Sequence, residues 1–152
     1  MKNCLLFTLT LFIHLSSYAQ DEVEDVKSTI VDYYWNVMYT NEDRKEISAI
    51  ADGFHEKFNM YVYYKGELSV RTRDGWMDIL QRNRDKARVN PSNKPKKKNR
   101  LEFGFVDVTG QTAVAKLLIY SNDEIKYTDY LSLYKIDGEW KIITKLFTFH
   151  QI

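Results

Sequence analysis

The chain has 152 residues, in which 22 lysine and arginine residues nearly balance 21 aspartate and glutamate residues. Aromatic residues make up 14% and charged residues 28%, a composition that excludes a disordered chain. The length corresponds to one domain with a sizeable core. Composition names no activity, so the functional argument depends on where individual side chains are placed.

The first 19 residues have the layout of a secretory signal peptide. A short start containing Lys2 precedes an apolar stretch, Leu5–Leu15, and small residues end at Ala19. This pattern predicts cleavage after Ala19 and an exported protein, periplasmic or secreted. The apolar stretch has about half the length of a membrane-spanning helix, so we expect no membrane anchor after cleavage. Cleavage also removes Cys4, the single cysteine, and with it any disulfide or thiol nucleophile.

The remaining residues, 20–152, are expected to form a single domain that begins with helices. Apolar side chains at three- and four-residue steps predict the first helix, and Thr72 is placed to cap the third. A Lys65-Gly66 turn separates two short strands. The predicted elements are a helix over 21–40, a helix over 42–51, strands over 59–64 and 67–71, and a helix from Thr72 to about Arg88.

The last third of the chain is predicted to be entirely strand. Its segments are rich in β-branched and aromatic residues, and Asp137-Gly138 is a strong hairpin signal. Helices followed by an antiparallel meander indicate an α+β fold in which the helices cover one face of the sheet. The predicted strands are Leu101–Val108, Thr112–Tyr120, Ile125–Ile136 and Trp140–Phe149.

The hairpin turns predict which strand residues face each other. If the turns at Asn122-Asp123 and Asp137-Gly138 have two residues each, Lys116 lies opposite Asp129 and Thr144 lies opposite Leu131. Because side chains alternate along a strand, these four side chains are then expected on the apolar face that meets the helices. An acidic and a basic side chain are unexpected on a face that is otherwise apolar. A bulge at either hairpin would shift this register.

The order of elements and several short motifs resemble the putative lumazine-binding family of the nuclear transport factor 2-like superfamily. The resemblance implies a cone, in which a curved sheet wraps around helices and encloses a cavity. The superfamily includes ketosteroid isomerase, scytalone dehydratase, polyketide cyclases and binding proteins without chemistry, so the fold does not transfer an activity. The motifs are Phe54-His55, Arg73-Asp74-Gly75-Trp76, Gly110-x-x-Ala113-Val114-Ala115-Lys116, Tyr127-Thr128-Asp129-Tyr130-Leu131-Ser132-Leu133 and Lys135-Ile136-Asp137-Gly138-x-Trp140-Lys141-Ile142.

Asp129, Lys116 and His55 form the candidate chemical site. A carboxylate in an apolar cone can act as a general base with His55 as proton partner. The alternative is that Lys116 neutralises Asp129 without chemistry and that His55 is structural. A second set of side chains is predicted to line a cavity for a flat or hydrophobic ligand. That set comprises Tyr33, Tyr34, Trp35, Tyr63, Trp76 and Thr144.

Three functions remain open at this point. The first is binding of a small hydrophobic or heterocyclic molecule by a homodimer formed through the outer sheet face. The second is a cofactor-free isomerase, dehydratase or cyclase with Asp129 or His55 as general base. The third is a dimeric accessory module without a ligand.

Other classes of function lack their sequence signals. No metal site is expected, because His55 and His150 are far apart and no cysteine remains. No cofactor is expected either, since the chain has no Gly-rich phosphate loop, nucleophile elbow or dinucleotide fingerprint. The seven positive charges from Lys86 to Arg100 have no aromatic residues among them, so we interpret this segment as a solvated loop and expect no nucleic-acid partner.

Overall fold

The computed structural model describes residues 20–40, 44–90 and 98–150. The predicted signal peptide, the first residues of the predicted second helix and the middle of the basic loop lie outside these ranges. In the described part of the chain, no helix is long and apolar enough to cross a membrane.

One helix opens the described chain, as the apolar periodicity predicts. Residues 20–30 are α-helical and continue without a break into a π-helical segment, η1 (Val31–Trp35), and a final turn, α2 (Asn36–Met38). Four side chains at three- and four-residue steps are completely or almost completely buried: Val26, Ile30, Tyr34 and Val37. The π segment contains Tyr34, and such segments are frequent at functional sites.

The next two helical segments lead into the sheet. A short 3₁₀ turn, η2 (Ile47–Ala49), and α3 (Ile50–Gly53) run directly into β1 (Phe54–Tyr64). The sheet therefore starts earlier than the sequence predicts, and Phe54-His55 belongs to the strand. After β2 (Glu67–Thr72), the third predicted helix is confirmed as α4 (Arg73–Val89), with the Thr72 hydroxyl accepting a hydrogen bond from the Gly75 amide at 3.3 Å.

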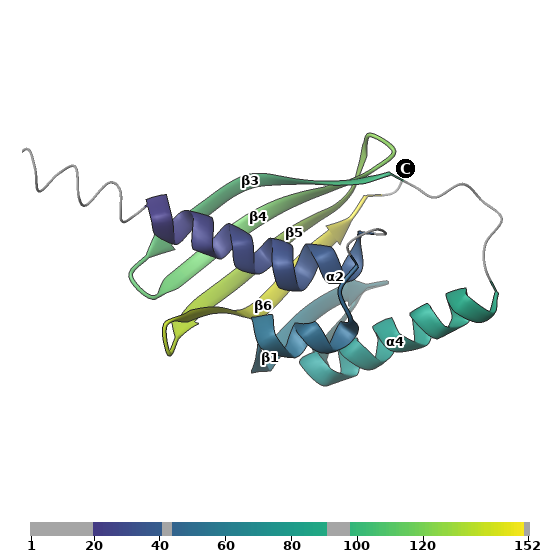
Figure 1. Ribbon diagram of the computed structural model, residues 1–152. Coiled ribbons are helices and arrows are strands. Elements are labelled where there is room, and N and C mark those ends of the chain that lie inside the picture. Colours follow the sequence, from purple (N-terminus) through teal and green to yellow (C-terminus); the bar gives the residue numbers. More distant parts are fainter. Residues whose placement is uncertain (1–19, 41–43, 91–97, 151–152) are drawn as a thin grey trace, which may run out of the picture.

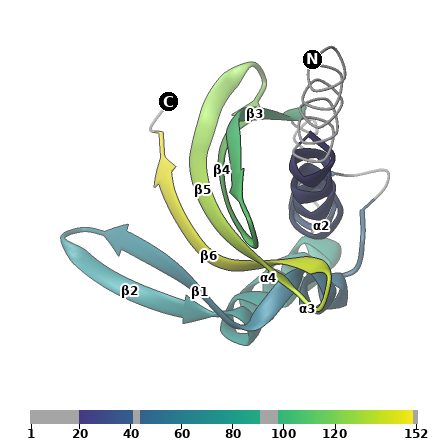
Figure 2. The ribbon, with the colours of Figure 1, turned by 90° about the vertical axis from the view of Figure 1, so that its left-hand side faces the viewer.

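Six strands form one sheet in the order β2-β1-β6-β5-β4-β3. All neighbours are antiparallel except β1 and β6, which are parallel. Figures 1 and 2 show the sheet curving around the opening helix, with α3 and α4 at one end and the β1–β2 hairpin extending beyond β6. This is the α+β architecture predicted from the sequence. The remaining strands are β3 (Asn99–Thr109), β4 (Thr112–Ser121), β5 (Glu124–Ile136) and β6 (Glu139–Phe149).

Two bulges overturn the predicted register. The turns do have two residues each, since Ser121 pairs with Glu124 and Ile136 pairs with Glu139. Beyond the turns, Lys126 is an extra residue between the β5 partners of Ile119 and Tyr120, and Ile143 is an extra residue between the β6 partners of Ser132 and Leu133. One extra residue reverses the face of every side chain beyond it.

The predicted pairing of Lys116 with Asp129 is therefore wrong. Lys116 pairs with Tyr130 and Leu117 pairs with Asp129, so Lys116 points to the outer face. The prediction for Thr144 fails for the same reason, because Lys145 and not Thr144 is the partner of Leu131. The prediction that Asp129 faces the helices is confirmed, since Asp129 is 0% exposed.

The inner face of the sheet and the opening helix share one hydrophobic core. Its side chains come from alternate positions of β4, β5 and β6, and the aromatic rings of Tyr34, Phe54, Phe58 and Trp76 pack against one another with centroids 4.9–6.4 Å apart. The buried sheet residues of β4–β6 are Ala113, Ala115, Leu117, Ile119, Leu131, Leu133, Trp140 and Ile142. The core thus fixes the opening helix against the middle of the sheet.

Polar contacts of Glu22 attach the start of the opening helix to β5 and β6 close to the turn that joins them. Glu22 is only 7% exposed. It accepts hydrogen bonds from Lys135 Nζ at 2.6 and 2.8 Å and from Trp140 Nε1 at 3.1 Å. Loss of the carboxylate would remove the acceptor of the buried Trp140 indole N–H, which is costly.

We predict that Glu22→Ala lowers the free energy of unfolding by about 2–3 kcal/mol, because it removes one partner of a largely buried ion pair. The matched control is Glu24→Ala, which removes the partner of an exposed pair with Lys27 and should change stability by less than about 0.5 kcal/mol. Urea unfolding followed by circular dichroism measures both. Equal effects of the two substitutions would contradict this role for Glu22.

Candidate functional site

A buried polar cluster occupies the inner face where the opening helix crosses β5 and β6. Asp129 is 0% exposed and Lys145 is 4% exposed. Lys145 Nζ lies 2.7 Å from Asp129 Oδ2. The Tyr34 hydroxyl donates a hydrogen bond to the same carboxylate oxygen and accepts one from Lys145 Nζ. The hydroxyl of Tyr39 lies 3.4 Å from that of Tyr34 and extends the cluster. We refer to Asp129, Lys145, Tyr34 and Tyr39 as the polar cluster.

Three members of the polar cluster, Tyr34, Asp129 and Lys145, are positioned by a local irregularity or by sheet register. Tyr34 belongs to the π-helical segment of the opening helix. Asp129 lies in the middle of β5, between Leu117 of β4 and Phe147 of β6. Lys145 faces inward because Ile143 bulges two residues before it. Without that bulge, Lys145 would lie on the outer face and Asp129 would have no cation beside it.

Burial controls the ionisation of the cluster. Desolvation lowers the pKa of Lys145 below its ordinary value, although the adjacent Asp129 carboxylate opposes that effect. Burial and the Asp129 charge raise the pKa of Tyr34 well above 10, and the same causes raise the pKa of Tyr39. Both phenols therefore remain protonated and serve as hydrogen-bond donors. Lys145 Nζ also lies 4.6 Å from the centre of the Tyr34 ring and 5.2 Å from that of Phe147, which favours its cationic form.

The second oxygen of Asp129 has no partner in the described part of the chain. Asp129 Oδ1 is buried and accepts no hydrogen bond from any described residue. A buried acceptor without a donor costs about 1–3 kcal/mol. The described residues leave this cost uncompensated.

A groove opens beside the polar cluster, where the β1–β2 hairpin diverges from the end of β6. Its volume is about 740 Å³. Phe147 connects the two sites, since its side chain lines the groove and its ring also faces Lys145 Nζ. The ring of Tyr127 packs against Phe147 and Phe149 at 6.2 and 5.5 Å. The lining residues are Val62, Tyr63, Tyr64, Glu67, Ser69, Arg71, Phe147, Thr148 and Phe149.

The groove combines flat aromatic surface with a few polar groups. Tyr63, Tyr64 and Phe149 are all at least half exposed. Glu67 and Arg71 come from β2, which forms the outer edge of the sheet. Small-molecule sites of this size are mainly apolar with a few polar groups that fix orientation. The groove therefore has the dimensions and the composition of a ligand site.

The residues predicted from the sequence are not brought together at one place. His55 lies on β1, where its Nδ1 accepts a hydrogen bond from the Lys57 amide at 3.2 Å. No described contact joins His55 to Asp129. Lys116 lies on the outer face, with its ammonium 6.0 Å from the Tyr130 ring. Thr144 pairs with Ser132 and is not in the polar cluster.

Two of the five predicted pocket aromatics, Tyr33 and Trp76, have different surroundings. Trp76 is 4% exposed and belongs to the aromatic core, so its ring occupies the space between α4 and the sheet. Tyr33 packs against Gly53 so closely that a Cβ atom there would lie 2.1 Å from Tyr33 Cβ. Its ring also lies under the ammonium of Lys45, at 5.1 Å.

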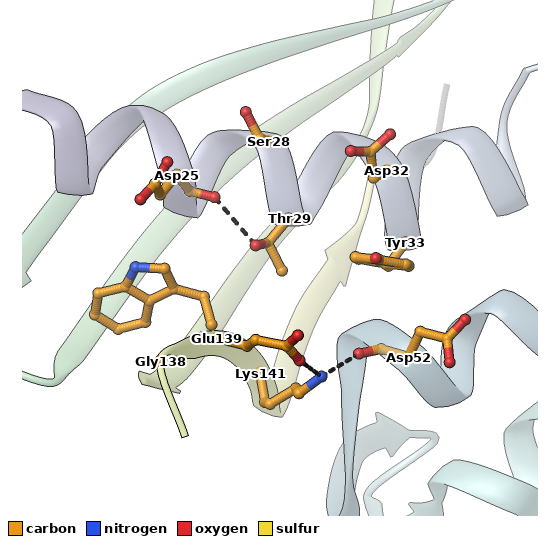
Figure 3. Close-up of a pocket in the computed structure, with 10 residues that line it drawn as sticks. Asp25, Ser28, Thr29, Asp32, Tyr33, Asp52, Gly138, Glu139 and Lys141 are labelled. Carbon is orange, nitrogen blue, oxygen red and sulfur yellow. Dashed lines mark hydrogen bonds and ion pairs between the residues drawn. The ribbon is translucent and has the colours of Figure 1, made fainter. Parts of the chain in front are cut away.

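Tyr33 also lines a separate, polar cleft of about 290 Å³ between the opening helix and the β5–β6 turn. Figure 3 shows the carboxylates of Asp25, Asp32 and Asp52 around this cleft. Lys141 donates hydrogen bonds to Glu139 and to the Asp52 carbonyl, both at 2.6 Å. No group of His, Cys, Asp and Glu among the described residues is arranged to hold a metal ion. The cleft does not include a member of the polar cluster.

Sequence reasoning missed two members of the polar cluster, Lys145 and Tyr39. Regular alternation places Lys145 with Lys141 on the outer face of β6, and the bulge at Ile143 reverses that placement. The sequence around Ile143 does not predict a bulge. Tyr34, in contrast, was accessible from the sequence, because it shares the apolar face of the helix with Ile30 and Val37.

The fold and the inner-face site define a protein of the nuclear transport factor 2-like class. The chain is similar to a protein of this class of unknown function from Silicibacter pomeroyi, with 16% identity, a TM-score of 0.63, and coverage of 86% of this chain and 98% of that one. A corresponding protein from Methylobacillus flagellatus gives 20% identity, a TM-score of 0.65, and coverage of 86% and 94%. These likenesses show the fold alone.

The family model described as "Putative lumazine-binding" matches residues 21–148, and the chain belongs to that family. Among curated proteins, the chain is similar to Aldolase FrzH of Cladobotryum sp.. The two are 28% identical over 97 residues, which cover 63% of this chain and 70% of that protein.

We predict that Tyr34 and Tyr39 do not ionise in the folded protein as the pH rises past 10, the ordinary phenol pKa. Because folding raises these pKa values, the stability that the two phenols contribute is fully present below pH 10 and is lost as the pH rises toward their folded values. Near-ultraviolet absorbance during alkaline titration measures phenolate formation.

The double variant Tyr34→Phe/Tyr39→Phe should leave the absorbance change that precedes unfolding unaltered. The wild-type protein, titrated under the same conditions, supplies the reference amplitude. A reduced amplitude in the double variant would show that the two buried phenols ionise in the folded state.

Proposed function

We propose that the chain is an exported protein that binds a small, flat heterocyclic or hydrophobic molecule in the groove between the β1–β2 hairpin and β6. The observation that carries the proposal is the buried Oδ1 of Asp129, which has no hydrogen-bond partner among the described residues and whose strand partner Phe147 lines this groove. The family description supports a heterocyclic ligand. Export rests on the signal-peptide pattern of residues 1–19.

The aromatic outer part of the groove matches the ring system of such a ligand, and the Asp129 acceptor at the inner end matches a hydrogen-bond donor on it. A ring system gains contact area and stacking against Tyr63, Tyr64 and Phe149. An N–H or O–H group at its inner end donates to Asp129 Oδ1 once it passes Phe147, and so relieves the cost of the unpartnered acceptor. Arg71 and Glu67 at the sheet edge orient the polar substituents that remain outside.

We predict saturable binding of at least one compound when the purified protein is titrated calorimetrically with a panel of fused-ring heterocycles that includes lumazine. Phe149→Ala removes a ring that is 52% exposed and lines the groove, and should weaken binding about tenfold. Val114→Ala on the outer face is the matched control and should leave the affinity unchanged. Absence of heat with every member of a broad panel would overturn the binding proposal.

Catalysis is the second candidate function. A buried carboxylate in contact with an amine and a phenol is an arrangement that moves protons. The likeness to Aldolase FrzH supports this candidate. Asp129 is the stronger candidate for the base, because His55 has no described contact with the cluster. Mass spectrometry of the panel compounds after incubation separates turnover from simple binding.

We further propose that two copies associate through the outer sheet face. The register aligns Phe105, Lys116, Tyr130 and Leu146 in one row across β3–β6. The three apolar members of this row are 43–53% exposed. A row of exposed apolar side chains on a sheet face is typical of a protein–protein contact.

We predict that Leu146→Glu converts the dimer to a monomer, because it replaces an exposed apolar side chain of the proposed contact with a charge. Light scattering after size-exclusion chromatography measures the mass in solution. Leu68→Glu is the matched control, since Leu68 is 63% exposed and lies on the edge strand β2. A wild-type protein of monomer mass at high concentration would contradict the dimer.

A further inference from the structure

Lys145 has surroundings that differ from those of an ordinary structural lysine. Lysine is almost never fully buried unless it is paired. Here the amine has its partner, Asp129, but it also contacts the Tyr34 hydroxyl and lies against the ring of Phe147. The proposed binding function uses Asp129 Oδ1 and the groove, and leaves this amine without a role.

We propose that Lys145 is a nucleophilic amine that condenses with the carbonyl group of an aldehyde or ketone bound at the inner end of the groove. This inference rests on the proposed binding function and specifies its substrate class. The geometry supports it on two counts. A proton acceptor lies 2.7 Å from Nζ, and Phe147, whose side chain lines the groove, has its ring centre 5.2 Å from the same nitrogen.

The condensation balances with the groups that are present. Lys145 first transfers one ammonium proton to Asp129, which leaves a neutral amine and a carboxylic acid. The nitrogen lone pair attacks the carbonyl carbon, the C=O π electrons move to oxygen, and a proton passes from nitrogen to that oxygen to give a carbinolamine. Asp129 then returns its proton to the hydroxyl group, which leaves as water. The products are a protonated imine on Lys145, an Asp129 carboxylate beside it, and one water molecule.

The remaining members of the polar cluster assist this reaction. The Tyr34 hydroxyl touches both reacting side chains and, because its pKa is raised, remains a donor that can stabilise the developing alkoxide. Burial disfavours the charged amine, which reduces the cost of forming the nucleophile. The same environment acts against hydrolysis of the imine, because it excludes bulk water.

Reductive trapping tests the proposal directly. The protein is incubated at neutral pH with propionaldehyde and cyanoborohydride, and the modified lysines are located by peptide mass spectrometry. We expect a propyl adduct on Lys145 at a rate at least about tenfold above that on the exposed surface residues Lys57 and Lys65. Labelling of Lys145 no faster than that of the surface lysines would overturn the proposal.

Variants identify the groups that control labelling. Lys145→Arg should abolish the fast adduct, while Lys116→Arg, a change on the outer face, should leave it intact. Asp129→Asn should slow labelling at least about tenfold, because it removes the proton acceptor. If Asp129→Asn does not fold, Phe147→Ala provides an independent measurement, since opening the path from the groove should accelerate labelling of Lys145. Unchanged labelling in Phe147→Ala would contradict access through the groove.

The labelling experiment and the calorimetric experiment test the two proposals independently. Calorimetric binding without fast labelling would refute the nucleophilic amine and leave the binding function standing. Fast labelling of Lys145 in a protein that binds none of the heterocycles would refute the heterocyclic ligand and support a carbonyl substrate.

Discussion

The contact between Asp129, Lys145 and Tyr34 is the constraint on which the rest of the structure depends. A carboxylate with no exposed surface must have compensation, and here it comes from two elements that are far apart in the chain. The opening helix contributes a phenol and β6 contributes an amine. The helix therefore has to lie across the sheet where these groups meet, and that position creates both the core and the inner site.

Small departures from regular geometry make this contact possible. A π-helical segment carries Tyr34, and single-residue bulges at Lys126 and Ile143 set the faces of β4 and β6. Bulges re-aim side chains next to functional sites. Because of the bulges, the partner of the buried Asp129 is Lys145 and not Lys116, the partner predicted from the sequence. Asp129 still has a lysine beside it, as the sequence predicts, but that lysine comes from β6 and not from β4.

The architecture was predictable because it depends on patterns that extend over many residues. The apolar periodicity of the opening helix, the Thr72 cap and both two-residue turns are confirmed. An acid on the inner face was also predictable, since Asp129 alternates with Leu131 and Leu133. The identity of its partner was not, because a bulge is one residue long and reverses alternation without changing composition. The groove was missed because it depends on how far the β1–β2 hairpin diverges from β6, a property of strand twist and not of local sequence.

The parallel pairing of β1 with β6 has a consequence for how the chain reaches this state. The two strands are separated by the whole intervening sequence, so closing the sheet requires a contact of high sequence separation, which slows folding. The pairing of Asp129 with Lys145, in contrast, depends only on β5 and β6, which a two-residue turn connects. Burial of this acid without its lysine would carry a large electrostatic cost. The register of the β5–β6 hairpin is therefore a condition for closing the interior, whichever strand β6 meets on its other side.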